Sequence, residues 1–172
     1  LAGMRHVNVS LDTLDREAYA RVTGRDMLDR VLDGIDTCLD LGMRVKINAV
    51  ALPEVNRGHM AQMLEFVRVR PVDLRFIERM PIGRAGGCGR ESVFSAKDIL
   101  AEARKHVHLT PISSNDRTGG PARMYQVGGH AGRFGIISGV SEHFCNTCNR
   151  LRITSDGRLR TCLFSDKHYD LR

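Results

Sequence analysis

The sequence predicts an α/β fold in which parallel strand–helix units are followed by a smaller antiparallel β module. Two observations predict this fold. Strand-like and helix-like patterns alternate over the first half of the chain, whereas short β-prone segments dominate after a glycine-rich stretch at Met80–Arg90 (MPIGRAGGCGR). Alternating strands and helices indicate a parallel sheet, because a parallel return needs a crossover helix. We therefore expect βα units over residues 1–90 and a second unit over residues 91–172.

The elements expected before residue 90 follow from hydrophobic periodicity. Apolar residues alternate in the expected strands and recur at helical spacing in the expected helices. Gly42 is a natural stop after the longest of these helices. In order, we expect a strand at Met4–Leu11, a short helix at Arg16–Val22, a helix at Met27–Leu41, a strand at Arg44–Val50, a loop at Leu52–Arg57, a helix at Met60–Val69 and a strand at Asp73–Glu78.

The elements expected after residue 90 are shorter. Met80–Arg90 lacks the Lys-Ser ending of a phosphate-binding loop, so we expect it to be a connector. Ser95 caps a helix that reaches about Lys105, with Asp98 at the spacing of a capping box. Short strands are expected at Met124–Val127 and Arg133–Ile137.

The composition narrows the class of protein. Of the 172 residues, 42% are hydrophobic and 27% are charged, which is typical of a globular domain. The formal charge of +6 suits an anionic partner. An aromatic content of 5% and the lack of tryptophan argue against a base-stacking surface for nucleic acid. No apolar run is long enough to span a bilayer. We expect no nucleic-acid partner and no membrane partner.

The cysteine count indicates reduced thiols. There are five cysteines, an odd number, and Cys38 and Cys88 stand far from the other three. A disulfide framework is therefore less favoured than free thiols in the cytoplasm.

Three cysteines lie in one stretch, Phe144–Asp166 (FCNTCNRLRITSDGRLRTCLFSD). The dipeptide Asp156-Gly157 between two β-prone segments predicts a hairpin with a two-residue turn. Folding at this turn brings Cys162 back beside Cys145 and Cys148, which builds a compact thiolate site. The expected register pairs Thr154 with Leu159, Arg152 with Thr161 and Leu151 with Cys162.

From the residues alone, two kinds of metal site fit these thiolates. A structural zinc needs a fourth protein ligand, for which His143 and His168 are the local candidates. An iron–sulfur cluster can use three cysteines and leave one iron open to another ligand. A chance group of buried cysteines is the third alternative.

Arginines beside the thiols favour the cluster. Arg150 and Arg152 are two residues apart on a strand, so they share one face. Their guanidinium groups offer forked donors to phosphate or carboxylate, which a structural zinc site does not need. Arg158 and Arg160 are expected only to solvate the hairpin.

The segment Phe144–Leu163 closely resembles the cluster motif near the carboxyl end of the GTP 3′,8-cyclase family, radical S-adenosylmethionine enzymes of molybdenum cofactor biosynthesis. Further matches occur in order upstream, so the resemblance covers essentially the whole chain. They are VNVSLDTLD at Val7–Asp15, RVKINAV at Arg44–Val50, RFIERMPIG at Arg75–Gly83 and GGHAGRFGIISGVSEHFC at Gly128–Cys145.

The resemblance implies both a fold and a set of ligand-binding residues. The fold would be the later part of an incomplete, six-stranded TIM-like (βα)6 barrel, followed by the antiparallel module with an iron–sulfur site. No residue receives a catalytic role. The implied roles are cluster ligation by Cys145, Cys148 and Cys162, GTP contacts by Lys46, Arg150, Leu151 and Arg152, and S-adenosylmethionine contacts by Ser10 and Met80.

Three of these residues are expected at one end of the barrel. Ser10, Lys46 and Met80 would lie at or just beyond the carboxyl ends of three successive strands. Enzymes built on such barrels have their active sites at the carboxyl ends of the strands.

The implied reaction converts GTP to (8S)-3′,8-cyclo-7,8-dihydroguanosine 5′-triphosphate, a lyase reaction that uses a 5′-deoxyadenosyl radical. The family generates this radical with a cluster on a CxxxCxxC motif, and the 172 residues contain no such motif. The Gly-Gly tail of the family is also missing. We therefore expect a fragment whose second 4Fe–4S cluster belongs to a segment ahead of Leu1, and we expect the isolated chain to be inactive.

The resemblance also implies a cytoplasmic protein, with a homodimer as one possible assembly. Two other interpretations stay open. One is a zinc-binding module with a basic surface, and the other is a different radical S-adenosylmethionine enzyme that acts on a peptide.

Overall fold

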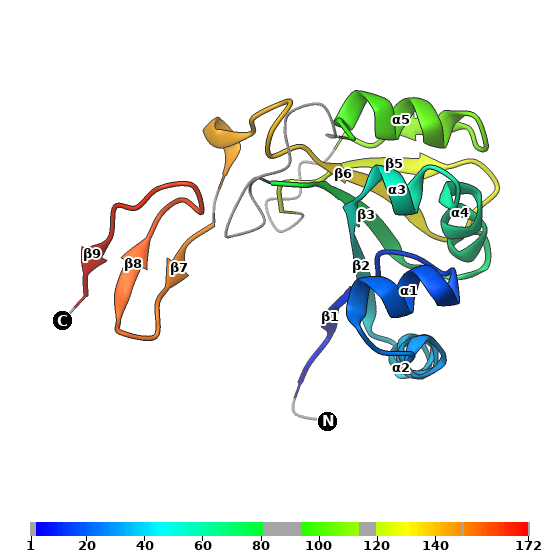
Figure 1. The fold of residues 1–172 in the computed structure, drawn as a ribbon, viewed down its shortest axis with the longest axis horizontal. Coiled ribbons are helices and arrows are strands. Elements are labelled where there is room, and N and C mark those ends of the chain that lie inside the picture. Colours follow the sequence, from blue (N-terminus) through cyan, green and yellow to red (C-terminus); the bar gives the residue numbers. More distant parts are fainter. Residues whose placement is uncertain (1–2, 81–93, 114–119, 149, 172) are drawn as a thin grey trace.

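The main element of the computed structural model, which describes residues 3–80, 94–113, 120–148 and 150–171, is a six-stranded mixed sheet (Figure 1). The strand order is β1-β2-β3-β6-β5-β4, in which the first four strands pair in parallel, whereas β5 pairs antiparallel with both β6 and β4. The strands are β1 (His6–Ser10), β2 (Arg44–Ala51), β3 (Asp73–Glu78), β4 (Leu109–Pro111), β5 (Arg123–Val127) and β6 (Arg133–Ile137).

A second, separate sheet follows near the carboxyl end. It consists of β7 (Arg152–Ile153), β8 (Arg158–Arg160) and β9 (Tyr169–Asp170), all antiparallel. The mixed α/β fold with a separate small antiparallel sheet confirms the fold class that the sequence predicts. The partial barrel stays a prediction, and β5 and β6, which were expected in the antiparallel module, instead belong to the large sheet, where β6 is parallel to β3.

The helices lie on one side of the large sheet, whereas the small sheet projects away from the body (Figure 1). They are α1 (Arg16–Thr23), α2 (Leu28–Asp40), α3 (Pro53–Asn56), α4 (Met60–Val69) and α5 (Ala96–Arg104). A short 3-10 helix at Cys145–Thr147 lies apart from them, in the segment between β6 and β7. No helix in the described parts of the chain is both long and apolar enough to cross a bilayer.

Most predicted elements are confirmed within two residues, and α4 and β3 have the predicted bounds. One prediction was wrong, because the expected loop at Leu52–Arg57 contains α3, which begins with Pro53 at its first position. The capping box of α5 is present: Asp98 N donates to Ser95 Oγ at 3.2 Å, and Ser95 N donates to Asp98 Oδ2 at 3.3 Å. Most of Met80–Arg90, including Cys88, lies outside the described residues.

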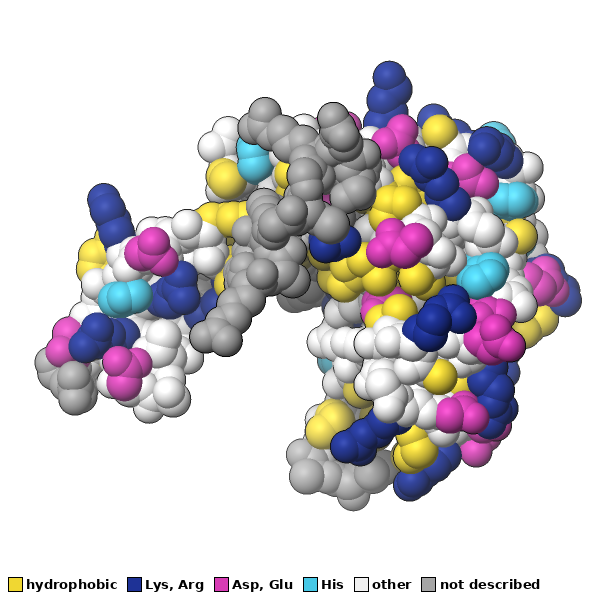
Figure 2. All heavy atoms as spheres, in the orientation of Figure 1, with side chains coloured by type: hydrophobic (Ala, Val, Ile, Leu, Met, Phe, Trp, Pro, Cys, Tyr) yellow, Lys and Arg dark blue, Asp and Glu magenta, His cyan; other side chains and the backbone are white. Residues whose placement is uncertain are grey.

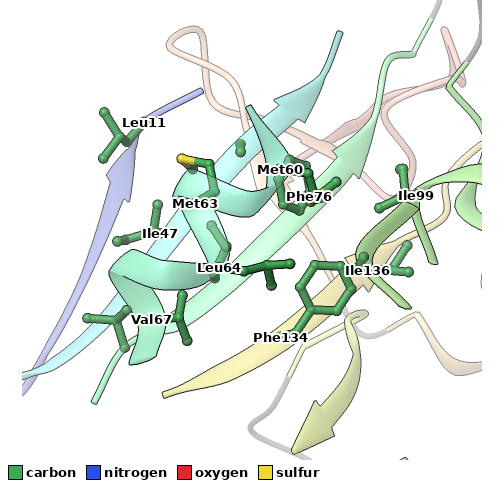
Figure 3. Packing of buried hydrophobic residues seen from close by; sticks show 14 of the residues in the cluster. Leu11, Ile47, Met60, Met63, Leu64, Val67, Phe76, Ile99, Phe134 and Ile136 are labelled. Carbon is green, nitrogen blue, oxygen red and sulfur yellow. The ribbon is translucent and has the colours of Figure 1, made fainter. Parts of the chain in front are cut away.

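The core lies between the large sheet and its helices (Figure 3). Alternate residues of each strand face the helices, and Ile47, Phe76 and Phe134 have no exposed surface. α4 covers the middle of the sheet with Met60, Met63, Leu64 and Val67. Each such side chain contributes about 1.5–3 kcal/mol on burial, so this packing holds the body together.

The other side of the large sheet is polar. The strand register places the remaining alternate residues on this side, which we call the open face. It carries Asn8, Ser10, Lys46, Asn48 and Arg75. Strands from both sides of residue 90 form this one sheet. The division of the chain at that residue stays a prediction.

Candidate active site

A pocket of about 350 Å³ lies where the large sheet ends and the small sheet begins. Its walls come from the ends of β3 and β6, the turn that carries Cys145 and Cys148, and the loop after β8 that carries Cys162. Met80, Arg150 and Arg152 also line it. The fold therefore brings six of the nine predicted site residues to one cavity.

The two neighbouring cysteines are held by one turn of backbone. Cys145 opens the 3-10 helix, and Cys148 N donates to Cys145 O at 3.2 Å. Both side chains are exposed, whereas Cys162 is half-buried. The cysteines of the described residues, Cys38 included, are free thiols.

The hairpin that returns Cys162 is present with a register one residue away from the prediction. Arg152 pairs with Arg160 and Ile153 with Leu159, so the predicted pairs were wrong. Thr154 N donates to Arg158 O at 2.9 Å and closes a three-residue loop. Gly157 alone takes the left-handed conformation there, with φ of 79°. A two-residue turn of the predicted type would need Asp156 in that conformation as well.

The surroundings of Cys148 favour its thiolate. The Arg150 backbone N–H lowers the pKa of the Cys148 thiol most strongly, burial opposes this effect, and the Arg150 and Arg152 guanidinium groups lower the pKa further. The Arg150 guanidinium also lies over the Phe144 ring, 5.1 Å from its centroid. The thiolate is the form that ligates metals.

The histidine candidates for a zinc site differ in position. His143 lines the pocket with the cysteines, whereas His168 is not among the lining residues. Within the described residues, no group of three or more His, Cys, Asp or Glu side chains is arranged to hold a metal ion. The three thiols line one pocket, but they do not converge on a common point at which a metal ion would be coordinated.

Three predicted site residues lie outside the pocket lining. Leu151 is 65% exposed, and Ser10 is the last residue of β1, as expected. The placement of Lys46 at a strand end was wrong, because β2 continues for five residues beyond it to Ala51. Lys46 lies on the open face, in register with Asn8 and Asp73.

Met80 fits closely against the loop after β6. A Cβ at Gly139 would lie 3.2 Å from Met80 Sδ, so a larger residue there would press on the methionine. Met80 lies two residues beyond the end of β3, where the sequence predicts it.

Glu78 is a buried carboxylate that the sequence analysis missed. It has no exposed surface and accepts hydrogen bonds from Ala96 N at 2.6 Å, Val140 N at 2.8 Å, Ser141 N at 2.9 Å and the Ser141 hydroxyl. Burial raises the pKa of Glu78, but these hydrogen bonds outweigh it and leave the pKa lowered. Glu78 thus ties β3 and the start of α5 to the loop that leads to Cys145. The signal in the sequence was a charge at a core-facing position of the alternating segment DLRFIE.

Arg75 is a buried cation on the open face that was also missed. It is 7% exposed, and its Nη2 donates to Asn8 Oδ1 at 2.7 Å. Arg75 Nε and Asn48 Oδ1 are buried without a hydrogen-bond partner in the described protein. A Cβ at Gly135 would lie 3.1 Å from Arg75 Cγ, so the glycine makes room for this side chain. Burial lowers the pKa of Arg75, although Asp73 opposes this effect.

Two protein-family models match successive parts of the chain. Residues 1–67 match the model of the Radical SAM superfamily, and residues 72–172 match the model described as Molybdenum Cofactor Synthesis C. The second match covers more than half of the chain, and the chain therefore belongs to the Molybdenum Cofactor Synthesis C family. The resemblance predicted from the sequence motifs is confirmed.

Named relatives match nearly the whole length of this chain. Over 99% of its length it is 38% identical to GTP 3′,8-cyclase of Alkaliphilus oremlandii and 42% identical to GTP 3′,8-cyclase of Mycobacterium ulcerans. It is 40% identical, over the same share, to Molybdenum cofactor biosynthesis protein 1 of Drosophila melanogaster. The matched part is 52%, 49% and 30% of these proteins, respectively, so the chain spans about half or less of the length of the relatives it matches.

Proposed function

We propose that the chain is the part of a GTP 3′,8-cyclase that binds GTP and an auxiliary 4Fe–4S cluster in molybdenum cofactor biosynthesis. The whole enzyme would convert GTP to (8S)-3′,8-cyclo-7,8-dihydroguanosine 5′-triphosphate. The observation that carries the proposal is the single pocket that collects Cys145, Cys148 and Cys162 beside Arg150 and Arg152. Relatives named GTP 3′,8-cyclase that match over 99% of the chain support it.

The three cysteines suit an iron–sulfur cluster chemically. Thiolates are the usual ligands of such clusters, and the lowered pKa of Cys148 favours the thiolate. When bound, a cluster held by three cysteines supplies one iron that a substrate atom can ligate. The exposure of Cys145 and Cys148 leaves that side of the pocket open to a ligand.

GTP would bind through its phosphates and its base. Arg150 and Arg152 line the pocket and offer forked donors that match phosphate oxygens, and Leu151 lies between them in the chain. Lys46 and Arg75 add cationic groups on the open face. The buried Arg75 Nε still needs an acceptor, which an anionic ligand would provide.

S-adenosylmethionine would bind at the carboxyl ends of the parallel strands. Ser10 ends β1, and Met80 follows β3. We infer that β1, β2, β3 and β6 are the later strands of an incomplete six-stranded barrel, because parallel strands in this order place those ends together. The free cysteines of the described residues support a reducing, cytoplasmic setting. A homodimer stays a prediction.

Anaerobic reconstitution with iron and sulfide tests the cluster. The expected product is brown and contains iron and sulfide in equal amounts, and Cys162→Ser loses both. A colourless chain that retains one zinc and no sulfide would overturn the assignment.

Equilibrium dialysis of the reconstituted chain tests the nucleotide. Arg150→Met and Arg152→Met are each expected to weaken GTP binding about tenfold or more, because a charge-assisted phosphate contact is worth about 1.5–3 kcal/mol. Arg158→Met is the matched control, since Arg158 is exposed and pairs with Asp156 at 3.1 Å. Equal affinity for ATP would instead favour a different radical S-adenosylmethionine enzyme.

A zinc module is the second candidate, because His143 lines the same pocket as the cysteines. The variant His143→Gln separates the two candidates. It lowers zinc affinity if His143 completes a Cys3His site, and it leaves the iron content unchanged if the cysteines hold a cluster.

A further inference from the structure

Arg160 closes a loop around the third cysteine of the pocket. It is the last residue of β8, and its Nη2 donates to Ser165 O at 2.6 Å and reaches Leu163 O at 3.4 Å. The residues between Arg160 and Ser165 all line the pocket, and they are Thr161, Cys162, Leu163 and Phe164. One side chain therefore joins the two ends of the pocket wall that carries Cys162.

The backbone of this wall is held more weakly than its side-chain clamp. Ser165 N donates to Cys162 O at 3.4 Å, which is long for a hydrogen bond. The guanidinium contact with Ser165 O is short and charge-assisted, and such bonds are roughly twice as strong as neutral ones. The shape of the loop therefore depends mainly on Arg160.

The place of Arg160 is unfavourable for a cation that only solvates a hairpin. Arg160 is half-buried, and its Nε is buried without a hydrogen-bond partner in the described protein. It also lies directly opposite Arg152 in the strand register, and like charges in such a pair destabilise a hairpin. Arg158, on the same strand, is exposed beside Asp156, which is the arrangement expected of a solvating arginine.

We propose that Arg160 is a positioning residue for the third thiolate. Its guanidinium fixes the backbone of residues 163–165 so that Cys162 faces the pocket with Cys145 and Cys148. The proposal rests on the proposed function only for the identity of the cofactor that Cys162 binds, because the clamp is a property of the loop itself.

The alkylation rate of each cysteine in the reduced, cluster-free chain measures this positioning. Arg160→Met keeps the apolar stem and removes the donors. We expect iodoacetamide to modify Cys162 about tenfold faster in this variant, because a charge-assisted hydrogen bond is worth about that factor in an opening equilibrium. Peptide mapping by mass spectrometry follows each thiol separately, and Cys38, Cys145 and Cys148 are expected to keep their rates.

Two further variants make the result specific. Arg158→Met removes a cation from the same strand without touching the clamp, and it is expected to leave the rates of Cys38, Cys145, Cys148 and Cys162 unchanged. Arg160→Lys keeps the charge, but its ammonium reaches less far than the Nη2 atom that contacts both carbonyl oxygens, and it is expected to raise the Cys162 rate by a smaller factor. An unchanged Cys162 rate in Arg160→Met, or an equal rise in Arg158→Met, would overturn the proposal. If Arg160→Met raises the alkylation rates of all the cysteines together, the variant is unfolded and Arg160→Lys is compared with the parent chain instead. Equal Cys162 rates in Arg160→Lys and the parent chain would then overturn the proposal.

Iron release then separates this proposal from the proposed function. After anaerobic reconstitution, Arg160→Met is expected to lose iron to a chelator about tenfold faster than the parent and Arg158→Met. A chain that binds no cluster at all refutes the proposed function but leaves the alkylation result standing. A cluster held equally well in Arg160→Met, with unchanged alkylation of Cys162, refutes the clamp alone.

Discussion

The two sheets of this molecule are both amphipathic, but only one has its apolar face covered. In the large sheet, Ile47 and Phe76 face the helices and are fully buried. In the small sheet, Ile153, Leu159 and Tyr169 lie in register across β7, β8 and β9, so they share one face. Ile153 is nevertheless 70% exposed and Tyr169 55% exposed.

This difference shows that the two regions keep their shapes for different reasons. Packing holds the body, because apolar burial is worth about 25 cal/mol per Å². The three short strands of the small sheet bury little apolar surface, so they gain little stability from apolar burial. The small sheet therefore depends on its turn, its backbone pairing and the Arg160 clamp.

The pocket lies at the junction of these regions. The body contributes Met80 and the ends of β3 and β6, whereas the segment after β6 contributes the three cysteines, Arg150 and Arg152. Figure 2 shows the small sheet as a projecting lobe. A ligand that binds all of these groups would stabilise the small sheet most, because the small sheet is the less stable of the two regions without the ligand.

The largest expected effect comes from replacing an isoleucine with alanine, once in the large sheet and once in the small sheet. Ile47→Ala removes a fully buried side chain and is expected to lower the free energy of unfolding by about 2–5 kcal/mol. Ile153→Ala changes an exposed side chain and is expected to change it by less than about 0.5 kcal/mol. Urea unfolding followed by circular dichroism measures both. A large loss in Ile153→Ala would show that the small sheet is packed in solution and would break the comparison.

The second-largest expected effect on stability comes from Glu78, which connects the body to the loop that leads to Cys145 and the small sheet. Glu78→Gln is expected to lower the free energy of unfolding by about 2–3 kcal/mol, because an amide has one acceptor oxygen and leaves the buried N–H of Ala96 or the part-buried N–H groups of Val140 and Ser141 without a partner. Urea unfolding at pH 7 measures the loss. The control is Glu142→Gln, since Glu142 is exposed and pairs with Arg123.

The pH dependence of the same carboxylate has a definite sign. The pKa of Glu78 is lower in the folded chain than its ordinary value of 4.5, so the unfolded state binds the proton more readily. The stabilisation by Glu78 is therefore complete above that ordinary value and is lost as the pH falls through the folded pKa. Between pH 7 and pH 3, the parent chain should lose more stability than Glu78→Gln. Equal losses would contradict the lowered pKa.

Local sequence patterns predict most of the fold because they report local interactions. The apolar periodicity of α4, the alternation in β3 and the Ser95–Asp98 capping box each lie within one element, and each is confirmed. β4 and β9 were missed because strands of three and two residues carry no periodic pattern. They exist through pairing with β5 and β8.

The site was predictable where residues lie close together in the chain. The Cys145–Cys148 pair and the hairpin that returns Cys162 were visible in the sequence. The partners of Glu78 were not, because a carboxylate that binds a loop 62 residues away leaves no local signature. Those of Arg160 lie within five residues of it, but contacts from a side chain to backbone carbonyls in an irregular loop follow no periodic pattern. The metal itself also stays a proposal, since thiolate softness alone permits both zinc and iron.

The smallest expected effect compares two glycines, one in each region. Gly157 has φ of 79° and closes the hairpin loop, so Gly157→Ala is expected to cost about 1 kcal/mol, because a side chain strains that conformation. Gly34 lies in α2 with nothing within 4 Å of the position that a methyl group would take, so Gly34→Ala is expected to stabilise the body by about 0.5–1 kcal/mol. Urea unfolding reports Gly34→Ala, and the trypsin cleavage rate after Arg158 reports Gly157→Ala, expected to rise about fivefold. If Gly157→Ala instead shifts the urea midpoint of the body, the two regions unfold as one unit, and the small sheet is more strongly coupled to the core than its exposure indicates.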